Sequence, residues 1–199
     1  MKTAFAVLAV TVAAACNSGD DGQSAAPEPV TGSFVGTVEG GSTSVAVVAG
    51  PGDDLLAYVT DGGNSVDWLD GVLEGPRDRA ARLGNDGGAV LDVRFTGASA
   101  SGAFARPGED PRRFTAEAAD EPAGLYRATE SFADGDYVGG WIVQRDGNTR
   151  GVVRRYETPL APGEVDATTF SAGDGSFAVP GGVLRVQRVD PGDELGLPL

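Results

Sequence analysis

The sequence contains no histidine, and its only lysine is Lys2 at the N-terminus. Without an imidazole there is no Ser-His-Asp or Cys-His nucleophile, no His-Glu-x-x-His zinc motif and no histidine acid–base catalysis. Without a lysine in the rest of the chain there is also no Schiff base, no Ser-Lys dyad and no phosphate-loop lysine. Carboxylates alone suit hard cations rather than zinc or copper. These absences predict a protein that is not an enzyme and that carries no cofactor.

Cysteine is equally rare, since Cys16 is the only one. An internal disulfide is therefore impossible, and the fold must depend on its core. The cysteine follows an apolar run, residues 4–15, which is interrupted only by Thr11 and preceded by Lys2. This pattern is typical of a signal peptide, and the run is shorter than the roughly 20 residues that a membrane-spanning helix needs. We expect residues 1–15 to be a signal peptide.

The four residues Ala13-Ala14-Ala15-Cys16 resemble the lipobox of bacterial lipoproteins, with Ala in the first position where Leu is favoured. The resemblance implies that Cys16 is lipidated and that the signal peptide is removed before it. It also implies that the lipid anchors the protein to the extracytoplasmic face of the cell membrane, which takes two acyl chains for stable attachment. The alternative is an ordinary signal peptide that contains a cysteine.

The segment after the cysteine is polar, with Gly, Ser, Pro and acids and almost no large apolar side chain. Such a segment cannot bury enough surface to order itself and has the composition of a flexible linker. We expect residues 16–31 to be the lipidated cysteine and a flexible acidic tether, and residues 32–199 to be a single all-β domain. The whole chain carries 29 carboxylates against 15 basic residues, a net charge of −14, which argues against nucleic acid as a partner.

Glycine and proline are abundant, at 31 and 12 residues, and both are unfavourable inside helices. The apolar runs between them are short, rich in β-branched or aromatic residues, and separated by turn clusters. Some runs alternate cleanly, as Leu91, Val93 and Phe95 do with Asp92 and Arg94. We predict an all-β antiparallel meander that forms a barrel or a sandwich of roughly 10–14 short strands. The predicted strands are residues 33–38, 44–48, 55–60, 66–74, 79–83, 90–95, 99–106, 113–117, 125–130, 137–144, 150–156, 167–170, 176–179 and 183–189.

Two segments, 112–121 and 125–134, are compatible with short helices because Ala and Glu favour helix. Strand or irregular structure is preferred for the first, and the second is left open. Asp146-Gly147 predicts a type I′ hairpin turn. The pair Gly139-Gly140 before Trp141 indicates a place where the strand bends or where an aromatic ring lies across the backbone. Such a place is either a packed corner or the wall of a ligand site.

Between residues 32 and 153, the segments GSFVGTVEG, RRFTAEA and YVGGWIVQRDGNTRGVV are similar to uncharacterised secreted proteins of high-GC actinobacteria. The resemblance implies export and a β-rich domain. It transfers no activity and no site residues.

Acidic loops offer the first candidate site. Asp61, Asn64 and Asp67 lie close together in an oxygen-rich, glycine-containing segment, and such loops can bind calcium. They do not match the EF-hand pattern. The alternative interpretation is that these are ordinary turn residues of a hairpin.

Two further constellations concern carbohydrate and anions. Asp67 and Asp70 flank Trp68, and two carboxylates beside an aromatic ring are the minimum for glycoside hydrolysis. Solvated acids next to a packed tryptophan are the simpler interpretation.

The segment from Arg145 to Arg150, followed by Arg154 and Arg155, is the one locally basic place, where arginine could bind a carboxylate or a phosphate. Pairing with the protein's own acids is the alternative.

Taken together, the sequence predicts a lipid-anchored binding or interaction module whose partner is an envelope protein, a glycan or a small molecule, with the membrane itself contacted through Cys16. Alternatives are a barrel that carries a small apolar ligand, a glycan hydrolase that depends on carboxylates alone, or a structural envelope protein. A carrier would hold an apolar cavity, whereas a hydrolase would bring two acids into one cleft.

Overall fold

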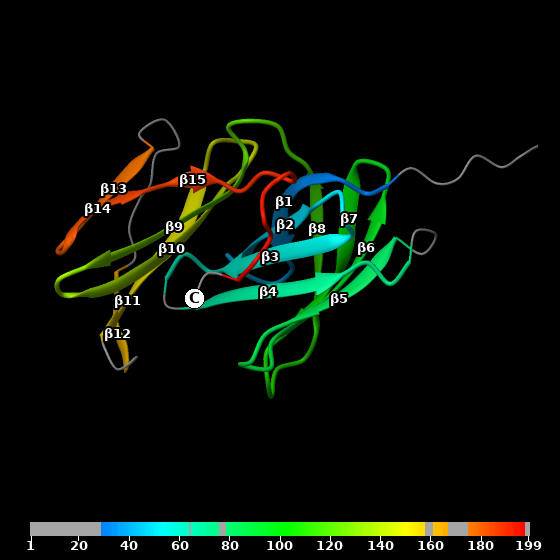
Figure 1. Ribbon diagram of the computed structural model, residues 1–199. Helices are drawn as coiled ribbons and strands as arrows, with labels where there is room; N and C mark the ends of the chain where they lie inside the picture. Colours follow the sequence, from blue (N-terminus) through cyan, green and yellow to red (C-terminus); the bar gives the residue numbers. More distant parts are fainter. Residues whose placement is uncertain (1–28, 64, 76–78, 158–160, 167–174, 198–199) are drawn as a thin grey trace, which may run out of the picture.

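The computed structural model describes residues 29–63, 65–75, 79–157, 161–166 and 175–197. It confirms the all-β prediction: a closed eight-stranded antiparallel barrel is followed by a five-stranded and a two-stranded antiparallel sheet (Figure 1). No helix in the described part of the chain is long and apolar enough to cross a membrane.

The barrel is a meander, in which every strand pairs with the next one along the chain and β1 pairs with β8 to close the ring. Of the two architectures that the sequence left open, this part of the chain adopts the barrel. Its strands are β1 (Gly32–Val38), β2 (Ser44–Ala49), β3 (Asp54–Thr60), β4 (Val66–Val72), β5 (Ala80–Gly84), β6 (Val90–Thr96), β7 (Ser99–Ala105) and β8 (Arg112–Ala118).

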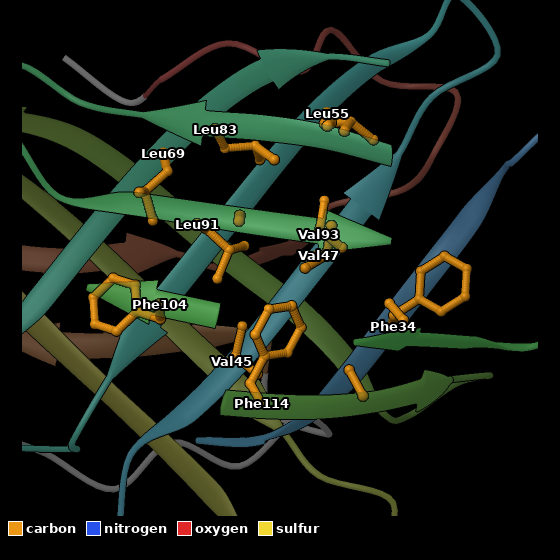
Figure 2. Close-up of a cluster of buried hydrophobic side chains, with 14 of the residues drawn as sticks. Phe34, Val45, Val47, Leu55, Leu69, Leu83, Leu91, Val93, Phe104 and Phe114 are labelled. Carbon is orange, nitrogen blue, oxygen red and sulfur yellow. The ribbon is translucent and has the colours of Figure 1, made fainter. Parts of the chain in front are cut away.

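The interior of the barrel is filled by apolar side chains that alternate with outward-facing residues. In β6, Leu91, Val93 and Phe95 are buried in the core while Asp92 and Arg94 are exposed. Figure 2 shows such side chains from several strands converging inside the ring. An eight-stranded barrel is just wide enough for its side chains to fill it. Val30, which precedes β1, also packs into this cluster, so the barrel core takes in a residue just before the expected domain start.

Glycines on the inner face let the barrel strands approach each other closely. A Cβ on Gly36 of β1 would collide with the carbonyl oxygen of Thr115 in β8 and lie 2.6 Å from the Cα of Ala116. A Cβ on Gly102 of β7 would collide with the carbonyl oxygen of Asp92. The sharp coiling of the closed sheet therefore depends on these two positions lacking a side chain.

The remaining strands form the second and third sheets. β9 (Gly124–Phe132), β10 (Gly135–Val143) and β11 (Thr149–Glu157) are long hairpin neighbours, flanked by β12 (Ala161–Asp166) and by the short β15 (Gln187–Arg188) in the order β12-β11-β10-β9-β15. β13 (Ser176–Val179) and β14 (Gly182–Arg185) pair only with each other.

These sheets lie against the barrel as further layers (Figure 1). One face of the five-stranded sheet, including Leu125 and Ile142, packs on outward-facing barrel residues such as Leu56 and Tyr58. The opposite face, which includes Trp141, packs against residues of the β13–β14 hairpin. The described residues thus form three hydrophobic clusters, one inside the barrel and one on each side of the second sheet.

Trp141 lies across a strip of backbone that has no side chains. A Cβ on Gly139, or on Gly151, the cross-strand partner of Trp141, would collide with the indole ring. The ring is fully buried and stands 5.7 Å from Phe177, centroid to centroid. The expectation that an aromatic ring lies across the backbone here is confirmed, and the place is a packed layer of the fold.

The two segments that were also compatible with helix form strands, β8 and β9, in agreement with the strands predicted at 113–117 and 125–130. Pairing along the sheet outweighs the modest helix preference of Ala and Glu. Other strand predictions need correction. The strand predicted at 183–189 is interrupted, giving β14 and β15. β12 was not predicted, and the strand predicted at 167–170 lies outside the described residues.

The turn at Asp146-Gly147 joins β10 and β11 as predicted, but with a different geometry. Only Gly147 has a positive φ, of 84°, whereas a type I′ turn needs two such residues. The N–H of Gly147 donates to the carbonyl of Gln144 at 2.9 Å, and the N–H of Gln144 donates to the carbonyl of Asn148 at 2.8 Å. The loop is therefore longer than two residues, and its glycine takes the bulge position.

Candidate functional site

The tip of the β10–β11 hairpin stands over the outer surface of the barrel and leaves a groove beneath and beside it. The groove has a volume of about 620 Å³ and is lined by residues of β1, β7 and β8 together with Ser44 and five hairpin residues, Gln144, Arg145, Asp146, Asn148 and Arg150. Its lining combines small apolar residues with hydroxyl, amide and charged side chains. We refer to it as the hairpin groove.

The floor of the hairpin groove carries a row of hydroxyl groups. Ser44, Thr37, Thr115 and Ser101 are consecutive cross-strand partners on β2, β1, β8 and β7, and all four line the groove. Directly paired residues have side chains on the same face of a sheet, about 5 Å apart. The four hydroxyls therefore form one continuous row across four strands, which we call the hydroxyl row.

The two ends of the hydroxyl row differ in exposure. Thr37, Thr115 and Ser101 are exposed, whereas Ser44 is only 1% exposed and lies at the end nearest β3. Although Ser44 is buried, it lines the hairpin groove, so this end of the row also belongs to the groove.

The hairpin is attached to the barrel at both sides of the groove. The amide of Gln144 donates from Nε2 to the carbonyl oxygen of Gly36 at 3.0 Å, and Arg145 forms an ion pair with Glu117 of β8. On the other side, Arg150 donates from Nη1 to the carbonyl oxygen of Asp61 at 3.2 Å. The stem of Arg150 also rests against Gly62, where an added Cβ would lie 3.5 Å away.

The charged groups of the groove are not equally engaged. Both oxygens of Asp146 accept hydrogen bonds from Asn148, at 3.0 Å from the backbone N–H and 2.7 Å from the side chain, and Glu117 is paired with Arg145. Arg150 donates to a neutral carbonyl, and no carboxylate among the described residues forms an ion pair with it. Within the described residues, the Arg150 guanidinium therefore has no acidic partner, and Asp146 is held by neutral donors alone.

The predicted calcium residues are placed as follows. The Asp61 carboxylate accepts hydrogen bonds from the backbone N–H groups of Gly63 and Ser65, at 2.8 and 3.2 Å. Burial alone would raise the pKa of Asp61, but these backbone donors hold it below its ordinary value. Asn64 lies outside the described residues. Within the described part of the chain, no three acidic side chains come together as a metal site.

Asp67, the third of these residues, belongs to the mouth of the barrel. Its Oδ2 accepts a hydrogen bond of 2.8 Å from Nε of Arg106, and both side chains are largely buried. Asn85 donates from Nδ2 to Oδ1 of Asp67 at 3.5 Å and to the carbonyl of Trp68 at 3.1 Å. The guanidinium of Arg106 also lies over the Phe104 ring, at 5.2 Å from its centroid.

The pair proposed for glycoside hydrolysis is not brought together. Along β4, Leu69 faces the barrel interior and Trp68 faces the second sheet. Because side chains alternate along a strand, Asp67 is on the inner side and Asp70 on the outer side. Trp68 packs on the Tyr58 ring at 4.4 Å between centroids, so it forms part of the contact between the barrel and the second sheet.

The arginines of the basic segment separate in the same way. Arg154 pairs with Val138, which lies on the same face of β10 as Ile142 and so faces the barrel, and Arg155 pairs with Tyr137 on the opposite face. Arg155 lies 3.7 Å from Asp134. The expectation that these arginines pair with the protein's own acids is confirmed for Arg145 and Arg155. The sequence identified the Arg145–Arg150 segment, but it gave no sign of the hydroxyl row, because that row depends on strand register.

Comparison of the chain with protein-family models, with curated proteins and with solved structures finds no match. The case for a function therefore depends on the groove and on the N-terminal sequence. Cys16 lies outside the described residues.

Proposed function

We propose that this protein is a membrane-anchored, extracytoplasmic binding module that holds its ligand in the hairpin groove. The observation that carries the proposal is the contrast between two spaces. The barrel interior is occupied by a continuous cluster of buried apolar side chains, whereas the groove outside it is open and lined by the hydroxyl row and by charged and amide side chains of the hairpin. Binding sites are concave and carry a few polar groups that fix the ligand.

The packed interior favours this proposal over a carrier of apolar ligands. Leu69, Leu83 and Leu91 are fully buried within the ring, and Arg106 and Asp67 lie together at its mouth. An apolar ligand inside the barrel would have to displace these side chains at considerable cost in packing. The separation of Asp67 from Asp70 likewise gives a carboxylate-dependent hydrolase no support.

Attachment through Cys16 completes the proposal. A lipid anchor holds the domain close to the membrane, where a binding module meets ligands of the cell envelope at high local concentration. The acidic segment before β1 supplies the distance between lipid and domain. Membrane attachment is tested by labelling with a palmitate analogue: we expect the wild-type chain to incorporate label and Cys16→Ser to lose both the label and membrane retention. Labelled Cys16→Ser protein in the membrane fraction would contradict the anchor.

Binding is tested by native mass spectrometry of the full-length protein purified in detergent from a bacterial host. We expect an adduct in the wild type and its loss in Thr115→Trp, because an indole at this position fills the hairpin groove. Thr96→Trp is the matched control, since Thr96 is exposed at the end of β6 and does not line the groove. An adduct that survives Thr115→Trp, or no adduct at all, would contradict binding in the groove.

A further inference from the structure

We propose that the ligand of the hairpin groove is an acidic saccharide, with its sugar hydroxyls on the hydroxyl row and a carboxylate on Arg150. This inference rests on the proposed function and names the class of ligand for the same site.

The spacing of the hydroxyl row suits a chain of sugar rings. Neighbouring strands are about 4.8 Å apart, so Thr37, Thr115 and Ser101 present one hydroxyl at each such interval. The length of one hexose in an extended glycan is similar. Each serine or threonine hydroxyl donates one hydrogen bond and accepts two, which is also what each sugar hydroxyl offers. A polyhydroxylated chain lying across β1, β8 and β7 can therefore exchange hydrogen bonds with every member of the row.

The positive charge of Arg150 is the reason for proposing that the saccharide carries a carboxylate. Arg150 presents a planar guanidinium whose only hydrogen bond within the described residues goes to the Asp61 carbonyl. Arginine binds carboxylates through two parallel hydrogen bonds, which are stronger than neutral ones. Ser44, the buried end of the hydroxyl row, lines the same groove. A carboxylate at this end would form an ion pair with Arg150 and place an oxygen-rich ring near Ser44.

Other ligand classes fit the groove less well. A cation would meet Arg150, and the acids that could offset it, Glu117 and Asp146, are already engaged. A polyanion such as a nucleic acid would be repelled by a chain of net charge −14. An apolar molecule would strip water from the hydroxyls and leave them without partners. A neutral glycan would use the hydroxyl row and leave Arg150 unmatched.

The test is a calorimetric titration of the full-length protein in detergent with two pairs of probes. Each pair consists of a uronic acid trimer, of galacturonate or of glucuronate, and its methyl ester, which keeps the hydroxyls and removes the charge. We expect at least one acid trimer to bind about tenfold more tightly than its ester, as one charge-assisted pair provides. Equal affinity for acid and ester in both pairs, or no binding of any probe, would overturn the proposal.

Variants assign the two contacts. Arg150→Gln is expected to abolish the preference for the acid while leaving ester affinity within about twofold. Thr115→Val is expected to weaken acid and ester alike. The control is Arg127→Gln, because Arg127 also donates to backbone carbonyls, those of Gly196 and Glu194, but lies outside the groove. A preference for the acid that persists in Arg150→Gln, or that is lost in Arg127→Gln, would overturn the assignment.

Thermal unfolding of each variant establishes that it is folded, and Arg150→Lys provides a second variant if Arg150→Gln unfolds. The lysine keeps the positive charge but lacks the planar guanidinium, so it is expected to retain part of the preference for the acid over the ester. The two proposals fail differently. Equal binding of acid and ester that is lost in Thr115→Val would remove the acidic saccharide and keep the binding module, whereas the absence of any adduct in native mass spectrometry would remove the module itself.

Discussion

The Tyr58 hydroxyl donates a hydrogen bond of 3.0 Å to the carbonyl oxygen of Gly140. This bond joins β3 of the barrel to β10 of the second sheet, 82 residues further along the chain. Gly140 permits it because a Cβ there would lie 2.7 Å from the Tyr58 ring and 2.6 Å from that of Trp68. Since the β10–β11 hairpin forms one wall of the hairpin groove, this contact helps to position the proposed site relative to the barrel.

We predict that Tyr58→Phe lowers the free energy of unfolding by about 1–3 kcal/mol, because a buried carbonyl loses its donor. The measurement is urea unfolding followed by tryptophan fluorescence, since Trp68 packs on Tyr58. Tyr156→Phe is the matched control: its ring is only partly buried, and we expect a change within about 0.5 kcal/mol. Equal effects of the two substitutions would show that the hydroxyl contributes nothing.

The same tyrosine predicts a loss of stability at alkaline pH. Burial raises the pKa of Tyr58 well above its ordinary value of about 10. Above pH 10 the unfolded chain therefore loses this proton while the folded chain keeps it, so the folded state binds more protons and stability falls as pH rises. We expect a decline of about 1.4 kcal/mol per pH unit from this group above pH 10, measured by unfolding at pH 9 to 12. Tyr58→Phe should make the decline shallower, and an unchanged slope would contradict this origin.

The coiling of the barrel predicts that Gly36→Ala is strongly destabilising. The new methyl group would collide with backbone atoms of β8, which cannot move without breaking the closure of the ring. We expect a loss of about 3 kcal/mol or more, at the upper end of overpacking effects, measured as a fall in the midpoint of thermal unfolding. Gly192→Ala is the control because a Cβ there would meet nothing within 4 Å. Similar midpoints for the two variants would refute the steric argument.

We predict that Asp67, at the mouth of the barrel, contributes more to stability than Asp70 does. Asp67→Asn removes the partner of a largely buried Arg106 and should cost about 1–3 kcal/mol. Asp70→Asn changes an exposed residue on the other face of β4, so we expect a change within about 0.5 kcal/mol. Chemical denaturation of both variants provides the comparison. An equal cost for both would mean that the ion pair with Arg106 has no net effect on stability.

Alternation along the chain was enough to predict the barrel strands. The alternating apolar residues Leu91, Val93 and Phe95 predict the inner face of β6. Turn clusters rich in glycine and proline mark most strand ends. β12 escaped prediction because its sequence contains Pro162 and Gly163, both of which are disfavoured within strands. Its pairing with β11 is a property of the assembled sheet, which no local pattern reveals.

The hairpin groove was predictable only in part. Arg145 and Arg150 stand out in the sequence because they are basic residues around a turn in an acidic chain. Thr37 and Thr115 do not stand out, since they become neighbours only when β1 pairs with β8 to close the ring. Asp67 and Asp70 suggested a possible hydrolase pair because they are close along the chain. In the fold, their side chains lie on opposite faces of one strand.

The pairing of β1 with β8 also sets the order in which the barrel can be completed. Seven of its eight strand pairings join strands that are consecutive along the chain. Each of these can form as soon as both of its strands have left the ribosome or a translocation channel. The eighth joins the two ends of the ring and must wait until Ala118 has emerged. Until then β1 presents an open edge, and the half of the hydroxyl row formed by Ser44 and Thr37 is separated from the half formed by Thr115 and Ser101. The proposed binding surface therefore comes into existence in the same step that removes the nascent chain's exposed edge.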